Sequence, residues 1–119
     1  NTLLAPLSVY GALYRVDVSA GTATAVELSE PMTTADGLVQ LGANRVAIAQ
    51  NMDHLIAIFE TDNGWQSAKR TEVFPDGFSF PTTGVQVDGR LFYLIGKLHE
   101  LFSGNREIAE FEIREIAAK

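Results

Sequence analysis

Short apolar runs of about four to eight residues, rich in β-branched and aromatic side chains, recur along most of the chain, as is typical of strands. Turn residues separate these runs. Gly42-Ala43-Asn44, Asp62-Asn63-Gly64 and Asp88-Gly89 tolerate the positive φ that short hairpin loops require. Connections this short join antiparallel strands, because a parallel crossover needs about a dozen residues or more. The pattern therefore predicts an all-β chain built from antiparallel meanders.

The segment from Thr34 to Glu60 has a looser copy that begins at Pro81. Arg45-Val46-Ala47-Ile48 matches Arg90-Leu91-Phe92-Tyr93, and Ala35-Asp36-Gly37-Leu38 matches Thr82-Thr83-Gly84-Val85. Repeats of about 40 to 50 residues, each with about four short strands, are typical of β-propeller blades. We therefore expect a partial β-propeller made of four-stranded antiparallel meander blades. A β-sandwich is the alternative, since the same strands build one if the repeat is accidental.

Residues 1–119 form a single domain of roughly two and a quarter blades in this interpretation. If strands are named a to d from the axis outward, the chain reads c and d, then a full blade, then a, b and c. The expected strands are residues 12–18, 22–28, 37–41, 45–50, 54–60, 66–74, 84–87, 90–95 and 108–116.

The last third of the chain holds two segments rich in helix formers. "KLHELFSG" predicts one helical turn that ends at Gly104. In the tail, Ala109, Phe111 and Ile113 alternate with charged residues, a period of two that favours strand over helix.

Barely more than two blades cannot close a ring, and an open stack exposes apolar blade faces at both ends. We therefore expect a homo-oligomer, most simply a dimer. The first ten residues are apolar and contain Pro6, which an edge strand tolerates. This segment is expected to supply the missing outer strand of the last blade on a neighbouring subunit.

Composition argues against several classes of binding partner. The formal charge of −6 leaves no basic stripe for phosphates, so nucleic acid and anionic membrane surfaces are not expected partners. No apolar stretch approaches the roughly 18 residues that a membrane span needs. The chain has no cysteine, and hence no disulfide and no thiolate metal site, which leaves its compartment undetermined.

Three segments, "GALYRVDVSAG", "ADGLVQLGANRVAIAQN" and "FPTTGVQVDGRLFYLIGK", carry a resemblance to a known family. They resemble blades in the C-terminal half of the six-bladed propellers of the senescence-marker-protein, gluconolactonase and luciferin-regenerating-enzyme family. The resemblance runs roughly from Tyr10 to Ile113. It implies a divalent metal such as Ca²⁺ on the axis, held by Glu, Asn and Asp side chains. Asp36 in "ADGL" matches the family's Asp, and Thr83 takes the corresponding place in the next blade.

Each candidate site residue also has a structural interpretation. Asp36, Thr83 and Asn51 are candidate ligand-binding residues, and Asp36 is the candidate metal ligand, although Asp-Gly is also common turn chemistry. Asn51, Asp53 and His54 form a run of oxygen and nitrogen donors that suits either a hard cation or a solvated hairpin turn. His99, beside Lys97 and Glu100, is expected to be a solvated loop histidine. Packing between blades is expected for three aromatic residues: Trp65, Phe78 and Phe80.

Two function hypotheses follow. The first is a propeller-like assembly or small-ligand-binding module that oligomerises and has no catalytic site or cofactor of its own. The alternative, implied by the resemblance, is a metal-dependent hydrolase of lactone-type substrates whose site is completed by further sequence or another subunit. The chain has no nucleophile elbow, P-loop, dinucleotide fingerprint or HExxH pattern.

Overall fold

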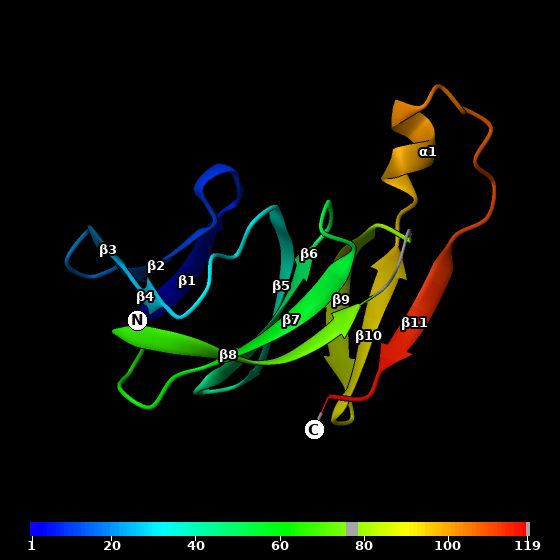
Figure 1. The fold of residues 1–119 in the computed structure, drawn as a ribbon. Coiled ribbons are helices and arrows are strands. Elements are labelled where there is room, and N and C mark those ends of the chain that lie inside the picture. The colour runs from blue at the N-terminus through cyan, green and yellow to red at the C-terminus, as the bar shows by residue number, and fades with distance from the viewer. Residues whose placement is uncertain (76–78, 119) are drawn as a thin grey trace.

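A computed structural model describes residues 1–75 and 79–118, which form three β-sheets in a row (Figure 1). The first sheet has the order β1 (Thr2–Leu7), β2 (Ala12–Asp17) and β3 (Thr22–Ala25). The central sheet has the order β4 (Glu27–Leu28), β8 (Ser67–Pro75), β7 (Leu55–Glu60), β6 (Arg45–Gln50) and β5 (Ala35–Gly42). The third sheet has the order β9 (Pro81–Val87), β10 (Arg90–Ile95) and β11 (Glu112–Ile116). Two short helices, η1 (Ser8–Tyr10) and α1 (Leu98–Phe102), lie in connections.

The predicted all-β class and the antiparallel meanders are confirmed. Strands β5 to β8 pair with their sequence neighbours in antiparallel register, and β9 to β11 do the same. Val46 and Leu91 both lie at the start of the second strand of their meander, as the alignment predicted. Among the described residues, neither helix has the length and apolar sequence needed to cross a membrane.

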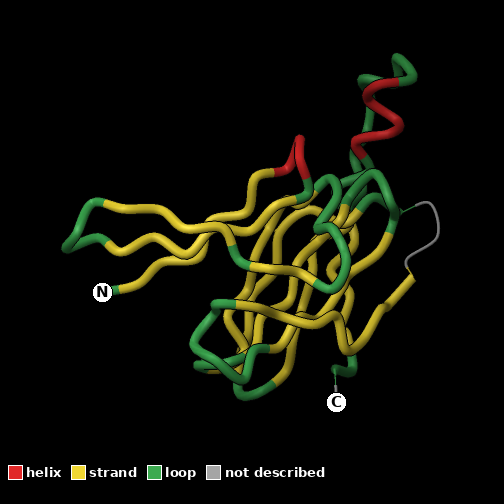
Figure 2. Tube along the Cα trace, turned by 60° about the vertical axis from the view of Figure 1, so that its left-hand side comes forward, coloured by secondary structure: helices red, strands yellow, loops and turns green. Residues whose placement is uncertain are grey.

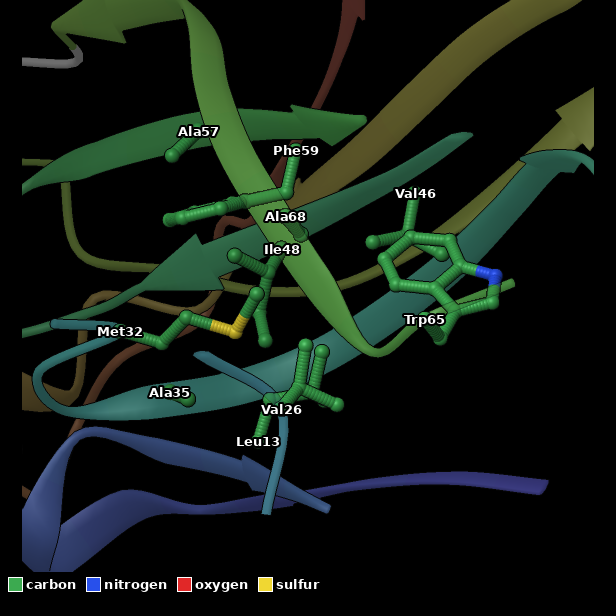
Figure 3. Packing of buried hydrophobic residues seen from close by; sticks show 10 residues of the cluster. All are labelled: Leu13, Val26, Met32, Ala35, Val46, Ile48, Ala57, Phe59, Trp65 and Ala68. Atoms are coloured by element: carbon green, nitrogen blue, oxygen red, sulfur yellow. The ribbon is translucent and has the colours of Figure 1, made fainter. Parts of the chain in front are cut away.

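The middle of the central sheet is buried on both faces. Its strands β6 and β7 are apolar at every position between their end residues. Val46, Ile48 and Phe59 face the first sheet, where they pack with Leu13 of β2 (Figure 3). The intervening residues face the third sheet and pack against Leu91 and Tyr93: Ala47, Ala49, Ile56 and Ile58. Small side chains on β6 lie beside large ones on β7, which leaves room over β6 for side chains of the third sheet.

The described chain forms an open row of sheets and does not close a ring. Its principal extents are 46 × 29 × 25 Å, and the end of the first sheet that holds the N-terminus extends away from the other two sheets (Figure 2). The central sheet has a neighbour on each face, which differs from a two-layer sandwich.

One expected strand is divided. Residues 22–28 form β3 and β4 with a break at Val26, whose N–H donates to the Leu13 carbonyl at 2.8 Å and whose side chain is buried. Beyond the break, β4 leaves β2 and pairs in parallel with β8 of the central sheet. The predicted outer strand of the first meander therefore links two sheets.

The N-terminal segment was predicted to pair with a neighbouring subunit, but it pairs within its own chain. Strand β1 pairs with β2 from Thr2↔Asp17 to Leu7↔Ala12, so it belongs to the first sheet and not to the last blade of a neighbour. Pro6 fits there because β1 lies at the sheet edge, where a missing N–H is tolerated.

The hairpin β1–β2 has the same register as the hairpin β6–β7. Thr2 pairs with Asp17 as Arg45 pairs with Glu60, and Leu7 pairs with Ala12 as Gln50 pairs with Leu55. Every partner pair of the first hairpin thus corresponds to a pair 43 residues later in the chain. In strand order, β1 therefore corresponds to β6, the second strand of the central meander.

The helical turn and the tail strand are both present. Helix α1 is followed by Gly104 at φ 97°, whose N–H donates to the Leu101 carbonyl, so Gly104 ends the turn as expected. Strand β11 begins at Glu112 and not at residue 108. Its pairing with β10 runs from Ile116 to Glu112 and stops at Ile95, so the residues before Glu112 lie outside this ladder.

The double-sided burial predicts how substitutions affect stability. Ile58→Ala removes a fully buried side chain between the central and third sheets, and we expect it to lower the free energy of unfolding by about 2–5 kcal/mol. Val9→Ala is the control, because that side chain is 85% exposed in η1. Urea denaturation followed by circular dichroism measures both. Similar losses for the two variants would contradict the assigned core.

Candidate functional site

The candidate site is the edge at which β5 and β9 begin, side by side. Gly37 allows this approach, because a Cβ there would lie 2.5 Å from both the Thr82 carbonyl oxygen and the Thr83 Cα. The Tyr93 hydroxyl donates to the Gly37 carbonyl at 3.2 Å and ties β10 to the same point. Asp36 and Thr83 are therefore brought to one edge, and both are exposed.

Asn51 comes to this edge from the turn between β6 and β7. Its Nδ2 donates to Asp36 Oδ2 at 3.1 Å, and its backbone N–H donates to the Thr34 carbonyl at 3.2 Å. Of the three predicted ligand-binding residues, Asp36 and Asn51 are thus in direct contact, and Thr83 reaches the same edge through its backbone, beside Gly37. One carboxylate, one amide and one hydroxyl can hydrogen-bond a small polar molecule.

The donor set does not fit the divalent metal that the family resemblance implies. A hard cation such as Ca²⁺ takes about six to eight oxygen ligands. Asn51 presents its nitrogen, and not its oxygen, toward Asp36. Residues 1–75 and 79–118 contain no group of three or more His, Asp or Glu side chains that could hold a metal ion.

The run Asn51, Asp53 and His54 does not form one ligand cluster, because its three side chains have different neighbours. Asp53 Oδ2 accepts from Thr33 Oγ1 at 2.5 Å and from Gln50 Nε2 at 3.0 Å. Gln50 is only 2% exposed and also donates to the Thr33 carbonyl at 3.0 Å. Asp53 therefore holds the β6–β7 turn against the segment before β5, in agreement with the turn interpretation.

Gln50 was not a sequence candidate. A glutamine at the end of an apolar strand has no distinctive spacing, and only the fold shows that Thr33 lies opposite it. Its buried amide nitrogen lies 3.0 Å from three acceptors, two on Thr33 and one on Asp53, so its two N–H groups anchor this end of the central sheet.

His54 and His99 belong to an aromatic cluster above the same edge. The ring centroids of His54 and Phe80 are 5.7 Å apart, those of Phe80 and His99 6.1 Å, and those of Phe80 and Phe102 6.0 Å. His99 was expected to be a solvated loop residue, but it is half-buried against Phe80 because α1 folds back over the start of β9. Phe80 is buried and adopts a φ of 56°.

Of the other two aromatic candidates, only Trp65 lies within the described residues. Trp65 packs in the cluster between the first and central sheets, and its Nε1 donates to the Ala43 carbonyl at 3.0 Å (Figure 3). Its predicted packing role is therefore confirmed. Phe78 lies outside the described residues.

No family model matches the chain, and a search of curated proteins finds no match. The resemblance to the lactonase-type propellers therefore rests on the quoted segments alone.

The absence of a metal-type donor set predicts the outcome of a titration. Calorimetric titration with Ca²⁺, Mg²⁺ and Mn²⁺ is expected to show no binding in the micromolar range, for the chain and for Asp36→Ala alike. Asp88→Ala is the matched control, since Asp88 is also an exposed aspartate next to a glycine, in the turn that follows β9. Micromolar binding that only Asp36→Ala abolishes would contradict the prediction and establish a metal site.

Tyr93 gives the edge a pH dependence. Burial raises the pKa of Tyr93 above its ordinary value of 10.0. The unfolded chain therefore ionises first, and the stability contributed by neutral Tyr93 is lost as the pH rises above about 10. Tyr93→Phe also removes the hydrogen bond to Gly37, which we expect to cost about 0.5–1.5 kcal/mol at pH 7.

Urea denaturation of the wild type and Tyr93→Phe at pH 7 and between pH 9 and 11 measures both effects. The difference between the two proteins is expected to shrink as the pH rises. Tyr10→Phe is the control, because Tyr10 is 79% exposed in η1. A difference that stays constant across the pH range would contradict the assignment to Tyr93.

Proposed function

We propose that this protein is a non-catalytic assembly module in which two copies pack head to tail into a propeller-like ring of six sheets. One observation supports the proposal above all. The two flanking sheets bury the central sheet from both sides, yet their own outer faces are apolar and exposed.

The outer face of the third sheet is defined by the residues that alternate with its core positions. Val85, Val87 and Ile113 are 55%, 49% and 73% exposed, and Phe92 and Leu94 are half-buried on the same face. Arg90 and Glu115 form a bidentate pair there at 2.8 and 2.6 Å, with the guanidinium 5.0 Å from the centre of the Phe92 ring. The charges on this face are thus paired with each other.

The outer face of the first sheet is uncharged. By the register of β1, β2 and β3 it consists of apolar side chains alone: Leu3, Ala5, Leu7, Ala12, Tyr14, Val16, Ala23 and Ala25. Leu3 is 59% exposed. Contiguous exposed apolar surface of this kind marks an interaction site in a soluble protein.

A second copy is the partner because the two outer faces correspond to faces that already pack inside the chain. Leu3 and Val16 correspond by register to Val46 and Phe59, which face the first sheet. Phe92 corresponds in the sequence repeat to Ala47, which faces the third sheet. The third sheet of one copy laid on the first sheet of the next therefore repeats the packing inside each chain.

The number of sheets supports closure by two copies. Head-to-tail contacts form a ring when the rotation between copies closes. Three sheets per copy give six in a dimer, the number of blades that the family resemblance implies. The edge that carries Asp36, Thr83 and Asn51 holds first strands of two meanders, so in a ring it lies near the axis and offers a place for a small polar ligand.

A hydrolase of lactone-type substrates is the second candidate function. It is favoured by the exposed Asp36 carboxylate at the edge where β5 and β9 begin. It also requires oxygen donors beyond those that the described residues bring to that edge. The calorimetric titration separates it from the assembly module.

Sedimentation velocity tests the assembly. We expect a dimer of two 12.9 kDa chains, which Val85→Glu or Leu3→Glu converts to monomer because each contact uses one face from each copy. Val9→Glu is the matched control, since Val9 is 85% exposed in η1, outside both faces. A monomeric wild type would overturn the proposal.

Mixing the two variants tests the head-to-tail arrangement. A pair made from Val85→Glu and Leu3→Glu keeps one unaltered contact, so the mixture is expected to re-form a heterodimer. An interface that pairs like faces gives no such recovery. Recovery of association on mixing is therefore specific to the proposed geometry.

A further inference from the structure

Arg15 places a charge where the matching hairpin has an apolar core residue. By the 43-residue register, Arg15 of β2 corresponds to Ile58 of β7. Ile58 is fully buried between two sheets, whereas Arg15 is half-buried on the inner face of the first sheet, on the same side of β2 as the buried Leu13. A charge in such a position costs free energy unless a partner offsets it.

Arg15 has no acidic partner among the described residues. Its Nη1 donates to the Gly64 carbonyl at 3.1 Å, in the turn between β7 and β8, and this is its one side-chain hydrogen bond to the described chain. Four other arginines each contact a glutamate: Arg45, Arg70, Arg90 and Arg114. A guanidinium has five N–H donors, so most of those on Arg15 are available to an anion.

A cavity of about 290 Å³ adjoins this guanidinium. Its wall consists of polar residues and one glycine: Thr2, Arg15, Asp17, Thr22, Thr24 and Gly64. The three threonine hydroxyls make no hydrogen bond within the described part of the chain. Five of the six wall residues lie in β2, β3 and the β7–β8 turn, so the cavity is formed chiefly by these elements.

Asp17 limits the charge of a ligand in this cavity. Its Oδ1 accepts from the N–H groups of Ser19 and Ala20, both at 2.9 Å, so the carboxylate is held in the turn after β2. This negative charge repels a doubly charged anion more than a singly charged one. A carboxylate is singly charged, and its two oxygens match the planar guanidinium of Arg15.

We propose that this cavity binds a small organic molecule through a single carboxylate group. The Arg15 guanidinium pairs with the carboxylate, and the hydroxyls of Thr22 and Thr24 hydrogen-bond its oxygens. The size of the cavity suits a small metabolite.

The carboxylate site is separate from the other two proposed sites. It lies on the inner face of the first sheet, whereas the proposed dimer uses outer faces. Gly64 follows the end of β7, and Asn51 precedes the start of the same strand, so the cavity and the edge at Asp36 lie at opposite ends of β7.

Acetate is the probe, with sulfate as the doubly charged comparison and chloride as the control for ionic strength. Two-dimensional ¹H–¹⁵N NMR follows the Arg15 Nε–H and the backbone amides of β3 during each titration. We expect acetate to shift these signals saturably in the millimolar range, sulfate to bind more weakly, and chloride to give no saturable shift.

Arg15→Gln removes the charge and is expected to weaken acetate binding about tenfold or more. Thr24→Val removes one hydroxyl at almost constant volume and is expected to weaken binding about three- to tenfold. Arg106→Gln is the matched control, because Arg106 is an exposed arginine that also has no acidic partner in the described chain. The dispersion of each NMR spectrum verifies that the variant is folded.

Three results would overturn the proposal: no saturable shift with acetate, equal losses in Arg15→Gln and Arg106→Gln, or tighter binding of sulfate than of acetate. A loss in Arg15→Gln and Thr24→Val, with Arg106→Gln unchanged, would support it. Failure of the dimer test leaves this experiment unaffected, since a monomer retains the cavity.

Discussion

The buried middle of the central sheet is the constraint on which the rest of the structure depends. Strands β6 and β7 are apolar on both faces, so both faces must be removed from water. A hairpin of this kind cannot lie at the surface, and it requires one sheet on each side. The first and third sheets meet that requirement, and they are each left with one covered and one open face.

The outer faces of the two flanking sheets have the same requirement for a cover. The flanking sheets have no described neighbour on their outer sides, so their outer apolar residues remain exposed. A second copy is the simplest cover, because its free faces correspond to faces that already pack inside the chain. The proposed dimer therefore follows from packing in the same way as the internal stack, and it needs no special interface residues.

The candidate site is a by-product of this stacking. Neighbouring meanders place their first strands side by side, and Gly37 allows the backbones of β5 and β9 to touch. Asp36 and Thr83 lie at one edge for that reason, and Asn51 of the β6–β7 turn hydrogen-bonds Asp36 there. The resulting edge is polar and exposed, with its one central carboxylate already hydrogen-bonded by an amide. Such an arrangement suits recognition better than metal chemistry.

Local patterns in the sequence were enough to predict most of the strands. Short apolar runs and the Gly, Asn and Asp residues at the turns predicted the central and third meanders, and Gly104 predicted the end of the helical turn, because these features depend on neighbours in the chain. The predicted correspondence of Asp36 with Thr83 was one residue off. Ala35 and Leu38 of β5 pair as Pro81 and Gly84 of β9 do, so Thr82 is the counterpart of Asp36 and Thr83 that of Gly37.

Partners distant in the sequence were decided only by the tertiary structure. The apolar pattern shows which side of a strand is buried, but it does not show which strand lies alongside. The N-terminal segment was therefore expected to pair with a neighbouring subunit, whereas it pairs with β2 of its own chain. In the β6–β7 turn, Asn51, Asp53 and His54 contact three different partners: Asp36, Thr33 and Phe80. A tight turn points successive side chains in different directions. The sequence by itself thus determined the strands and their faces. Pairing at the edges and the separation of the turn residues required the fold, because both depend on contacts between segments that are far apart in the chain.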